Sequence, residues 1–236
     1  MGKKRKDAVD RFDGTVLYPP SEALGLVKSM STAGFDETVE AAFLLSIDAK
    51  QADQAVRGTI SLPHGTGKDV RVAVFAEGEQ AKEAEEAGAD LVGGAELAAA
   101  ITEGTQSLDW DVTIAMPSLM AHVGKVGRVL GPRGLMPNPK AGTVTMDIGK
   151  TVAEFKSGRV EYRNDRYGNV HIAVGRVSFD EKTLLENLAA VVDELTRVRP
   201  AATKGRYIRK LTLSSTMGMG VKVEPNSLDD LKELVF

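Results

Sequence analysis

The sequence lacks cysteine altogether, and none of its apolar runs is long enough to cross a membrane. Without cysteine, disulfides and thiolate metal sites are excluded, and a reducing compartment such as the cytosol is expected. A membrane-spanning helix needs about 18 consecutive apolar residues. The basic N-terminal stretch MGKKRKDAVDR also lacks the apolar core of a secretory signal. We therefore expect a cytoplasmic protein without a membrane partner.

Side chains that catalyse reactions or bind metals are scarce and scattered. The three histidines, His64, His122 and His171, are far apart, and no HExxH or other paired spacing occurs. The GTGK sequence at 65–68 lacks the wider glycine spacing of a phosphate loop, and Asp69 stands where such a loop needs Ser or Thr. We expect no catalytic residue, no cofactor and no metal. A nucleotide-binding enzyme built on the central α/β region stays open as the alternative function.

The net charge of −3 hides two regions of different character. Residues 69–158 carry 13 acidic and 8 basic side chains, and the remainder carries 20 acidic and 22 basic ones. No Asp or Glu occurs from Thr196 to Val223, in the remainder. The cations of this stretch are Arg197, Arg199, Lys204, Arg206, Arg209, Lys210 and Lys222. Because such side chains attract phosphates regardless of base sequence, they favour a nucleic-acid partner.

The basic stretch leads into LTLSSTMGMG at 211–220. Residues 207–213 alternate and are rich in β-formers, so they predict a strand that ends at hydroxyl groups and glycines. Glycine lets another molecule approach the backbone, and hydroxyls can bond to sugars and base edges. The alternative is a charged edge strand followed by a tight turn. Candidate RNA contacts are Ser214, Ser215, Thr216, Met217 and Gly218, with phosphate contacts from Lys204, Arg206 and Lys210.

The N-terminal part predicts a mobile basic arm at Lys3–Lys6, then a helix, a strand and a linker. Ser21 fits the N-cap of a helix that ends near residues 33–34. FDETVEAAFLLSI at 35–47 predicts the strand, and residues 54–68 the linker. Phe35 stands at the strand entrance, where a core position is favoured over an exposed position that could stack on RNA.

From Asp69 strands and helices alternate, which is typical of a parallel sheet covered by helices. This pattern predicts an α/β three-layer, Rossmann-like domain over residues 67–158, although no GxGxxG marks a dinucleotide site. Residues 124–144 are rich in glycine and proline and predict an irregular loop rather than a helix or strand. The loop could bind nucleic acid, but a packing role is favoured. Its cations are Lys125, Arg128, Arg133 and Lys140.

After residue 158, RVEYRNDRYGNVHIAV predicts a hairpin with strands at 159–166 and 168–174. Arg163 and His171 accompany tyrosines there, a pattern suited to stacking on RNA and contact with phosphates. An amphipathic helix is expected at 181–196.

The two ends of the chain together predict a discontinuous α+β domain, residues 1–66 plus 159–236, with an antiparallel-containing sheet and two helices. Because the α/β domain interrupts it twice, hinge linkers are expected near 64–69 and 156–160.

Several segments resemble the bacterial family of the large-subunit ribosomal protein L-one, the protein of the mobile ribosomal stalk. They occur in the family order from about residue 15 to 224. The segments are AGFDETVE at Ala33, VRGTISLPHGTGK at Val56, EEAGADLVGG at Glu85, VGRVLGPRGLMPNPKAGTV at Val126, EYRND at Glu161, AATKGRYI at Ala201 and SSTMG at Ser214.

The resemblance implies a non-enzymatic two-domain protein whose terminal domain binds large-subunit (23S-type) rRNA at the stalk. It also implies a part in the release of exit-site tRNA, repression of its own operon by binding that mRNA, and contact with other ribosomal components. We expect a monomer when the protein is free. The rRNA contacts of the family are similar to Phe35 and the triad Thr216, Met217 and Gly218.

Two features depart from this family. Met219 stands where a proline usually follows the triad. The tail at 226–236 exceeds the usual end of the family, and its leucine spacing predicts a short solvated or self-packing helix.

Overall fold

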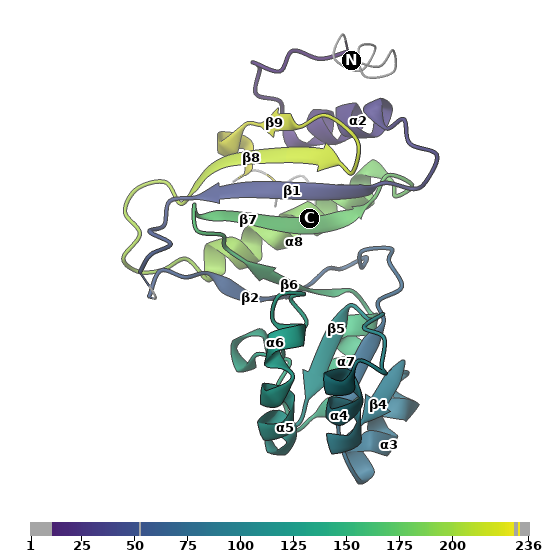
Figure 1. Ribbon diagram of the computed structural model, residues 1–236. Helices are drawn as coiled ribbons and strands as arrows, with labels where there is room; N and C mark the ends of the chain where they lie inside the picture. Colours follow the sequence, from purple (N-terminus) through teal and green to yellow (C-terminus); the bar gives the residue numbers. More distant parts are fainter. Residues whose placement is uncertain (1–10, 52, 229–230, 232–236) are drawn as a thin grey trace. The chain divides into compact units, whose positions relative to one another are not determined.

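The computed structural model describes residues 11–51, 53–228 and 231. Contacts divide the chain into two compact units, unit 1 with residues 1–67 and 160–236 and unit 2 with residues 68–159 (Figure 1). That the two units move as separate domains about hinges stays a prediction. The basic arm expected at Lys3–Lys6 lies outside the described residues.

Unit 1 contains a four-stranded sheet in the order β7-β1-β8-β9. All three strand pairs are antiparallel. Residues far apart in the sequence therefore lie side by side, with β1 between β7 and β8. The strands are β1 (Thr38–Leu45), β7 (Asn169–Arg176), β8 (Ile208–Ser215) and β9 (Val221–Val223).

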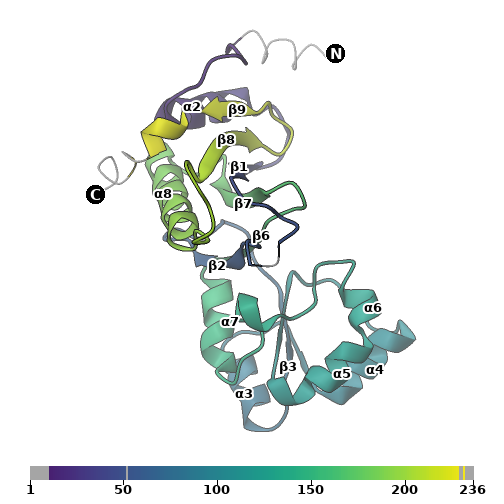
Figure 2. The same cartoon turned by 90° about the vertical axis from the view of Figure 1, so that its left-hand side faces the viewer.

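Helices α2 (Pro20–Met30) and α8 (Glu181–Arg197) cover one face of this sheet (Figure 2). Along α8, Leu184, Leu188 and Leu195 are fully buried at helical spacing, which confirms the predicted amphipathic helix. In β1, Val39 and Phe43 point to the same core, because alternate residues of a strand face one side. The opposite face of the sheet carries the solvent-facing side chains.

The predicted limits of the first helix were wrong at both ends. Pro19 occupies the N-cap and Ser21 lies inside α2, where proline at the first helical turn costs no hydrogen bond. The helix ends at Met30, and Ser31 is extended. The backbone N–H groups after it are used by a buried carboxylate, which competes with further helix.

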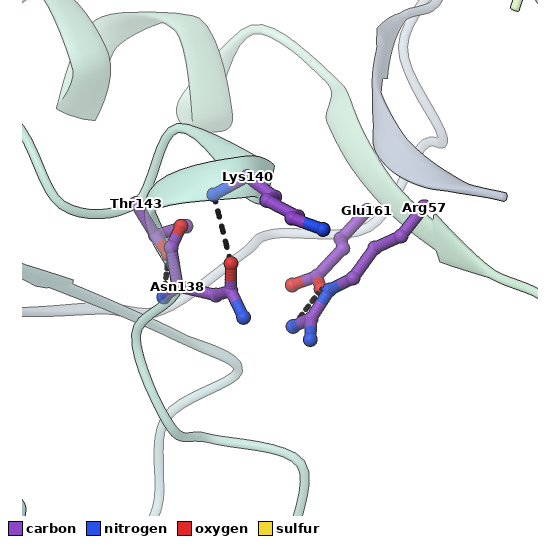
Figure 3. A network of polar contacts seen from close by, with 5 residues as sticks. All are labelled: Arg57, Asn138, Lys140, Thr143 and Glu161. Carbon is purple, nitrogen blue, oxygen red and sulfur yellow. Dashed lines mark hydrogen bonds and ion pairs between the residues drawn. The ribbon is translucent and has the colours of Figure 1, made fainter. Parts of the chain in front are cut away.

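A two-stranded sheet joins β2 (Arg57–Ser61) to β6 (Arg159–Arg163). Arg57 and Glu161 form an ion pair at 2.6 Å between these strands (Figure 3). The predicted linker at 54–68 is therefore partly a strand. The predicted hairpin was also wrong, because β6 pairs with β2 and β7 with β1, leaving a single bridge between Asn164 and Val170.

Unit 2 has a three-stranded parallel sheet in the order β4-β3-β5, and helices cover both of its faces (Figure 2). One core packs α3 and α7 on the sheet, and the other packs α4, α5 and α6. The layers match the α/β pattern expected from the alternating strands and helices. The elements are β3 (Val72–Phe75), α3 (Glu79–Glu86), β4 (Leu91–Gly93), α4 (Ala95–Glu103), β5 (Val112–Ala115), α5 (Met120–Lys125), α6 (Gly127–Leu130) and α7 (Ile148–Lys156).

The glycine- and proline-rich segment is more ordered than its composition predicted. It contains the end of α5, the whole of α6 and a 3-10 turn at Pro139–Ala141. Val126 and Leu130 are buried one helical turn apart, a short apolar repeat that the many glycines concealed. Within the 3-10 turn, the Asn138 side chain accepts a hydrogen bond from Lys140 N at 2.8 Å (Figure 3).

The C-terminal tail is described only at residues 226–228 and 231. A 3-10 turn covers Pro225–Leu228, and Leu228 and Leu231 are buried in the core of unit 1. The expectation of a solvated or self-packing helix is wrong for these two leucines. The rest of that predicted helix lies outside the described residues.

Candidate nucleic-acid interface

Two loops of unit 1 meet where β1 begins and β8 ends, and a buried carboxylate joins them. Glu37, in the loop at 31–37, is 0% exposed. Its Oε1 accepts hydrogen bonds from Ser31 Oγ at 2.5 Å and Ala33 N at 3.1 Å. Its Oε2 accepts one from Met217 N at 2.8 Å, in the loop at 215–220. We call residues 31–37 and 215–220 the loop pair.

The charge of Glu37 is stabilised by this arrangement. Burial alone would raise the pKa of the carboxyl, because a charged group loses its hydration. Hydrogen bonds from the Ser31 hydroxyl and from the backbone of Met217 and Ala33 outweigh burial and lower the pKa to about 2. The Ser215 hydroxyl also lowers this pKa, although it falls short of a hydrogen bond with any described residue. Glu37 is therefore an anion that fixes both loops.

Two further contacts position the loop pair. Thr216 Oγ1 accepts a hydrogen bond from Thr38 N at 3.0 Å, where β1 begins. On the other side, the Asp36 carboxylate accepts hydrogen bonds from Ser178 N at 3.1 Å and Ser178 Oγ at 2.7 Å. Arg176 donates to Asp36 O at 2.8 Å. The loops are thus attached to β1 and to the end of β7.

Gly218 is required by the close packing of its loop. A Cβ at this position would lie 2.3 Å from Ser215 Oγ, far inside van der Waals contact. Because Ser215 is buried beneath the turn, the hydroxyl has little room to move. Gly218 therefore shapes the loop.

The loop pair presents two large apolar side chains to solvent. Phe35 is 56% exposed and Met217 is 71% exposed. The favoured core position for Phe35 was wrong, because residues 35–37 precede β1 and the backbone turns to bury Glu37 instead. An exposed aromatic ring and a flexible thioether on a fixed scaffold can stack on or pack against a ligand.

The sequence matches the family model described as the ribosomal protein L1p/L10e family over residues 27–219. The chain belongs to this family. A protein of Thermobifida fusca (strain YX) called large ribosomal subunit protein uL1 is 54% identical over 225 residues, 95% of each chain. A protein of Bifidobacterium longum subsp. infantis with the same name is 54% identical over 226 residues, 96% of this chain and 97% of the relative.

Membership of a ribosomal-protein family decides between the two functions considered from the sequence, an RNA-binding protein and an enzyme. The chain is not an enzyme, and the alternative of a nucleotide-binding enzyme on unit 2 is set aside. Over the described residues, no cluster of three His, Cys, Asp or Glu side chains could hold a metal ion. In the same part of the chain, no helix has the length and apolarity to span a bilayer.

The structure divides the RNA contacts predicted from the sequence into two groups. One group lies in or beside the loop pair. It comprises Phe35, Ser214, Ser215, Thr216, Met217 and Gly218. Ser215 is buried, so its direct contact with RNA is not proposed. The second group lies toward the other end of the sheet. It comprises Arg163, His171, Lys204, Arg206 and Lys210.

The cations named before and after the 211–220 segment differ in their distance from the loop pair. Lys222 follows it in β9, whereas Lys204 and Arg206 do not lie near it. Lys204 and Arg206 precede β8, whereas Thr216 follows it, so the whole strand separates them. Its seven residue steps span roughly 23 Å at about 3.3 Å each. The edge-strand alternative was wrong, since β8 lies between β1 and β9.

Sequence reasoning missed the residues that hold the loop pair together. Glu37 stood among the alternating residues of a predicted strand, and nothing local marked its carboxylate as buried. Asp36 and Ser178 are 142 positions apart, so their hydrogen bond is a product of the fold. The sequence did contain one signal. Glu37 follows Ser31 and Thr32 by only six and five residues, and hydroxyl side chains of this kind often form hydrogen bonds with nearby groups of the chain.

Proposed function

We propose that this member of the ribosomal protein L1p/L10e family is a constituent of the large subunit of the cytoplasmic ribosome that binds large-subunit rRNA at the mobile stalk through the loop pair. The two relatives described above bear the name large ribosomal subunit protein uL1. Phe35, Thr216, Met217 and Gly218 would form the central contact. Unit 2 would then be available for another partner.

The observation that carries this proposal is the exposure of Phe35 and Met217 on loops locked by a buried anion. RNA is recognised largely by shape, by stacking on exposed bases and by contacts to ribose hydroxyls. Because hydrogen bonds already fix the backbone of both loops, binding costs little backbone conformational entropy. The Thr216 hydroxyl and the Gly218 backbone supply small polar groups beside them.

Replacing Met217 tests the proposal. Met217→Ala removes the exposed thioether while leaving the backbone N–H that binds Glu37. We expect the affinity for a stalk fragment of large-subunit rRNA to fall by roughly 1–3 kcal/mol. Filter binding at fixed salt measures it. Met146→Ala is the matched control, because Met146 is 59% exposed but lies in unit 2.

Equal affinities of the wild-type and Met217→Ala proteins would contradict the assignment. Thr216→Val provides a second variant, because valine keeps the size of the side chain but loses the acceptor for Thr38 N. Thermal unfolding of each variant separates a loss of contact from a loss of fold.

The same loop pair would also bind the protein's own operon mRNA and repress its translation. If a folded mRNA segment copies the rRNA surface, both RNAs compete for one site. We expect unlabelled stalk rRNA to displace the mRNA leader, and Met217→Ala to weaken both complexes by a similar factor. Independent binding of the two RNAs would contradict this part of the proposal.

A part in the release of exit-site tRNA is supported by a basic segment of unit 2. No Asp or Glu occurs from Val112 to Met146, although the unit as a whole is acidic. Lys125, Arg128 and Arg133 are exposed there, and cations of this kind bind phosphates. We expect Arg128→Gln with Arg133→Gln to weaken deacylated tRNA binding to ribosomes while stalk rRNA affinity stays unchanged.

A further inference from the structure

A cavity lies beside the solvent-facing side of the four-stranded sheet. It measures about 390 Å³ and opens between the segment at 15–17 and strands β8 and β9. Its volume falls in the range of about 300–1,000 Å³ that is usual for small-molecule sites. Its lining includes Thr15, Leu17, Arg209, Lys210, Thr212 and Lys222.

The rim of this cavity is held in place by backbone contacts. Tyr18 N donates to Lys222 O at 3.0 Å, and Glu224 N donates to Tyr18 O at 2.9 Å. Tyr18 therefore pairs with β9 as a single parallel bridge to Val223. Leu17, beside this bridge, is 51% exposed and offers an apolar surface at the cavity.

Three cations at the cavity are available for a ligand. The side chains of Arg209, Lys210 and Lys222 are exposed, and none forms an ion pair or side-chain hydrogen bond with another described residue. The acidic side chains of the neighbouring segments are engaged locally. Asp13 accepts hydrogen bonds from Thr15 N at 2.8 Å and Thr15 Oγ1 at 2.6 Å, and Glu224 accepts one from Asn226 at 3.4 Å. Hydrogen bonds from Thr15 lower the pKa of Asp13, and the nearby charge of Lys222 lowers it further.

The cavity is continuous with a row of side chains across the sheet. His171 pairs with Ala42, Ala42 with Thr212, and Thr212 with Lys222. These residues face solvent, while Ile172, their neighbour on β7, is buried. Lys210 lies in β8, and Ser215, where the loop pair begins, is five residues further along this strand, roughly 17 Å at about 3.3 Å per residue. A folded RNA on the loop pair can therefore reach the cavity across this face.

We propose that this cavity receives one unpaired nucleotide of the RNA that the loop pair binds, with phosphates on Lys210 and Lys222 and the base against Leu17. The inference rests on the proposed function, which it extends to a second contact. Phosphate oxygens match the three cations, and the exposed apolar side chain of Leu17 can make van der Waals contact with a base. Thr212 lines the cavity, and His171 lies two strands away in the same row.

Two variants test the cavity in the full-length protein with a stalk fragment of large-subunit rRNA as the probe. Lys210→Gln with Lys222→Gln should reduce the slope of log affinity against log salt by about one to one and a half units, because each phosphate contact contributes about 0.7. Leu17→Ala should weaken binding about fivefold and leave this slope unchanged. Lys182→Gln with Lys50→Gln is the charge-matched control, because both lysines are exposed in unit 1 and neither lines the cavity.

Chemical probing of the RNA gives a direct readout. In the wild-type complex, one unpaired nucleotide should be protected at its base, and Leu17→Ala should restore its reactivity without altering the rest of the footprint. An unchanged footprint together with unchanged affinity and slope would overturn the inference. Thermal unfolding confirms that each variant is folded.

The failure of this inference can be distinguished from failure of the proposed function. If the wild-type protein binds the stalk fragment no better than a scrambled hairpin, the proposed function fails. If binding depends on Met217 but not on Leu17 or Lys222, only the cavity assignment fails. A third outcome is that free AMP or UMP binds saturably in a manner that depends on Lys222, while the cavity variants leave the RNA footprint unchanged. The cavity would then bind a free nucleotide, and the proposal that a nucleotide of the bound RNA occupies it would be overturned.

Discussion

At the scale of single residues, a carboxylate inside the protein organises the candidate interface. Glu37 has no exposure to solvent, yet its pKa lies far below the ordinary 4.5. A buried charge is costly unless donors surround it, and Ser31, Ala33 and Met217 supply them. The geometry of the exposed Phe35 therefore depends on a residue that is itself buried.

Replacing Glu37 should change both stability and its dependence on pH. Because the folded pKa of about 2 lies below the unfolded value of 4.5, the stabilisation is complete above pH 4.5 and is lost as pH falls toward 2. A shift of this size corresponds to about 3 kcal/mol. We expect Glu37→Gln to lower the free energy of unfolding at pH 7 by roughly 2–3 kcal/mol and to flatten its acid dependence.

Urea denaturation between pH 2.5 and 7 measures this effect. Glu40→Gln is the control, because Glu40 is an exposed carboxylate on the adjoining strand β1. A Glu37→Gln protein that matched Glu40→Gln in stability and pH dependence would contradict the structural role of the buried carboxylate.

Gly218 gives a second prediction at this scale. Gly218→Ala places a methyl group 2.3 Å from Ser215 Oγ, so the loop must shift and rRNA affinity should fall about tenfold. Ser215→Ala removes that oxygen and leaves the Ser215 Cβ at 3.4 Å. We expect the double variant to recover most of the affinity of Ser215→Ala alone, measured by filter binding. If the double variant recovered no affinity, the loss caused by Gly218→Ala would not come from contact with Ser215 Oγ.

At the scale of elements, pairing between distant strands decides where each residue lies. Local patterns predicted α8 closely, because it carries a complete apolar period. They failed for β2, which has only one buried residue, and for β9, which is only three residues long. Strand β2 is specified by its partner β6, and β9 by its partner β8.

The candidate site was predicted in part for the same reason. The exposed hydroxyl and glycine turn could be found from composition, because its residues are consecutive. Its location relative to Lys204 and Arg206 could not, since that depends on the direction of β8 in the sheet. The contact between Asp36 and Ser178 likewise depends on the pairing of β1 with β7.

The close packing of β2 provides a prediction for this scale. A Cβ on Gly58 would lie 2.7 Å from the hydroxyl of the buried Tyr162. We expect Gly58→Ala to reduce the free energy of unfolding by about 1–3 kcal/mol, because the ring has no space to retreat. Gly34→Ala is the control, since a Cβ there meets no described atom within 4 Å. Equal denaturation midpoints would contradict the packing.

At the scale of the whole molecule, each unit has its own apolar core. The core of unit 1 is built from both ends of the chain, and unit 2 has separate cores on the two faces of its sheet. A unit with a complete core can fold alone. The division of the chain thus separates the loop pair from the basic segment of unit 2.

Removing unit 2 tests this separation. We expect a protein in which a short Gly-Ser linker replaces residues 68–159 to unfold cooperatively and to bind stalk rRNA within about threefold of the full chain. Its affinity for ribosomal exit-site tRNA should be lost. An unfolded product, or one that loses rRNA binding while folded, would contradict the independence of unit 1.

The central claim is that the exposed Phe35 and Met217 of the loop pair bind one place on large-subunit rRNA. The most direct measurement is a hydroxyl-radical footprint on the complete rRNA, made with the wild-type protein and with the Phe35→Ala, Met217→Ala double variant. We predict protection confined to the stalk with the wild-type protein and its loss with the folded variant. The same stalk protection with both proteins, or protection scattered over other regions, would contradict the account.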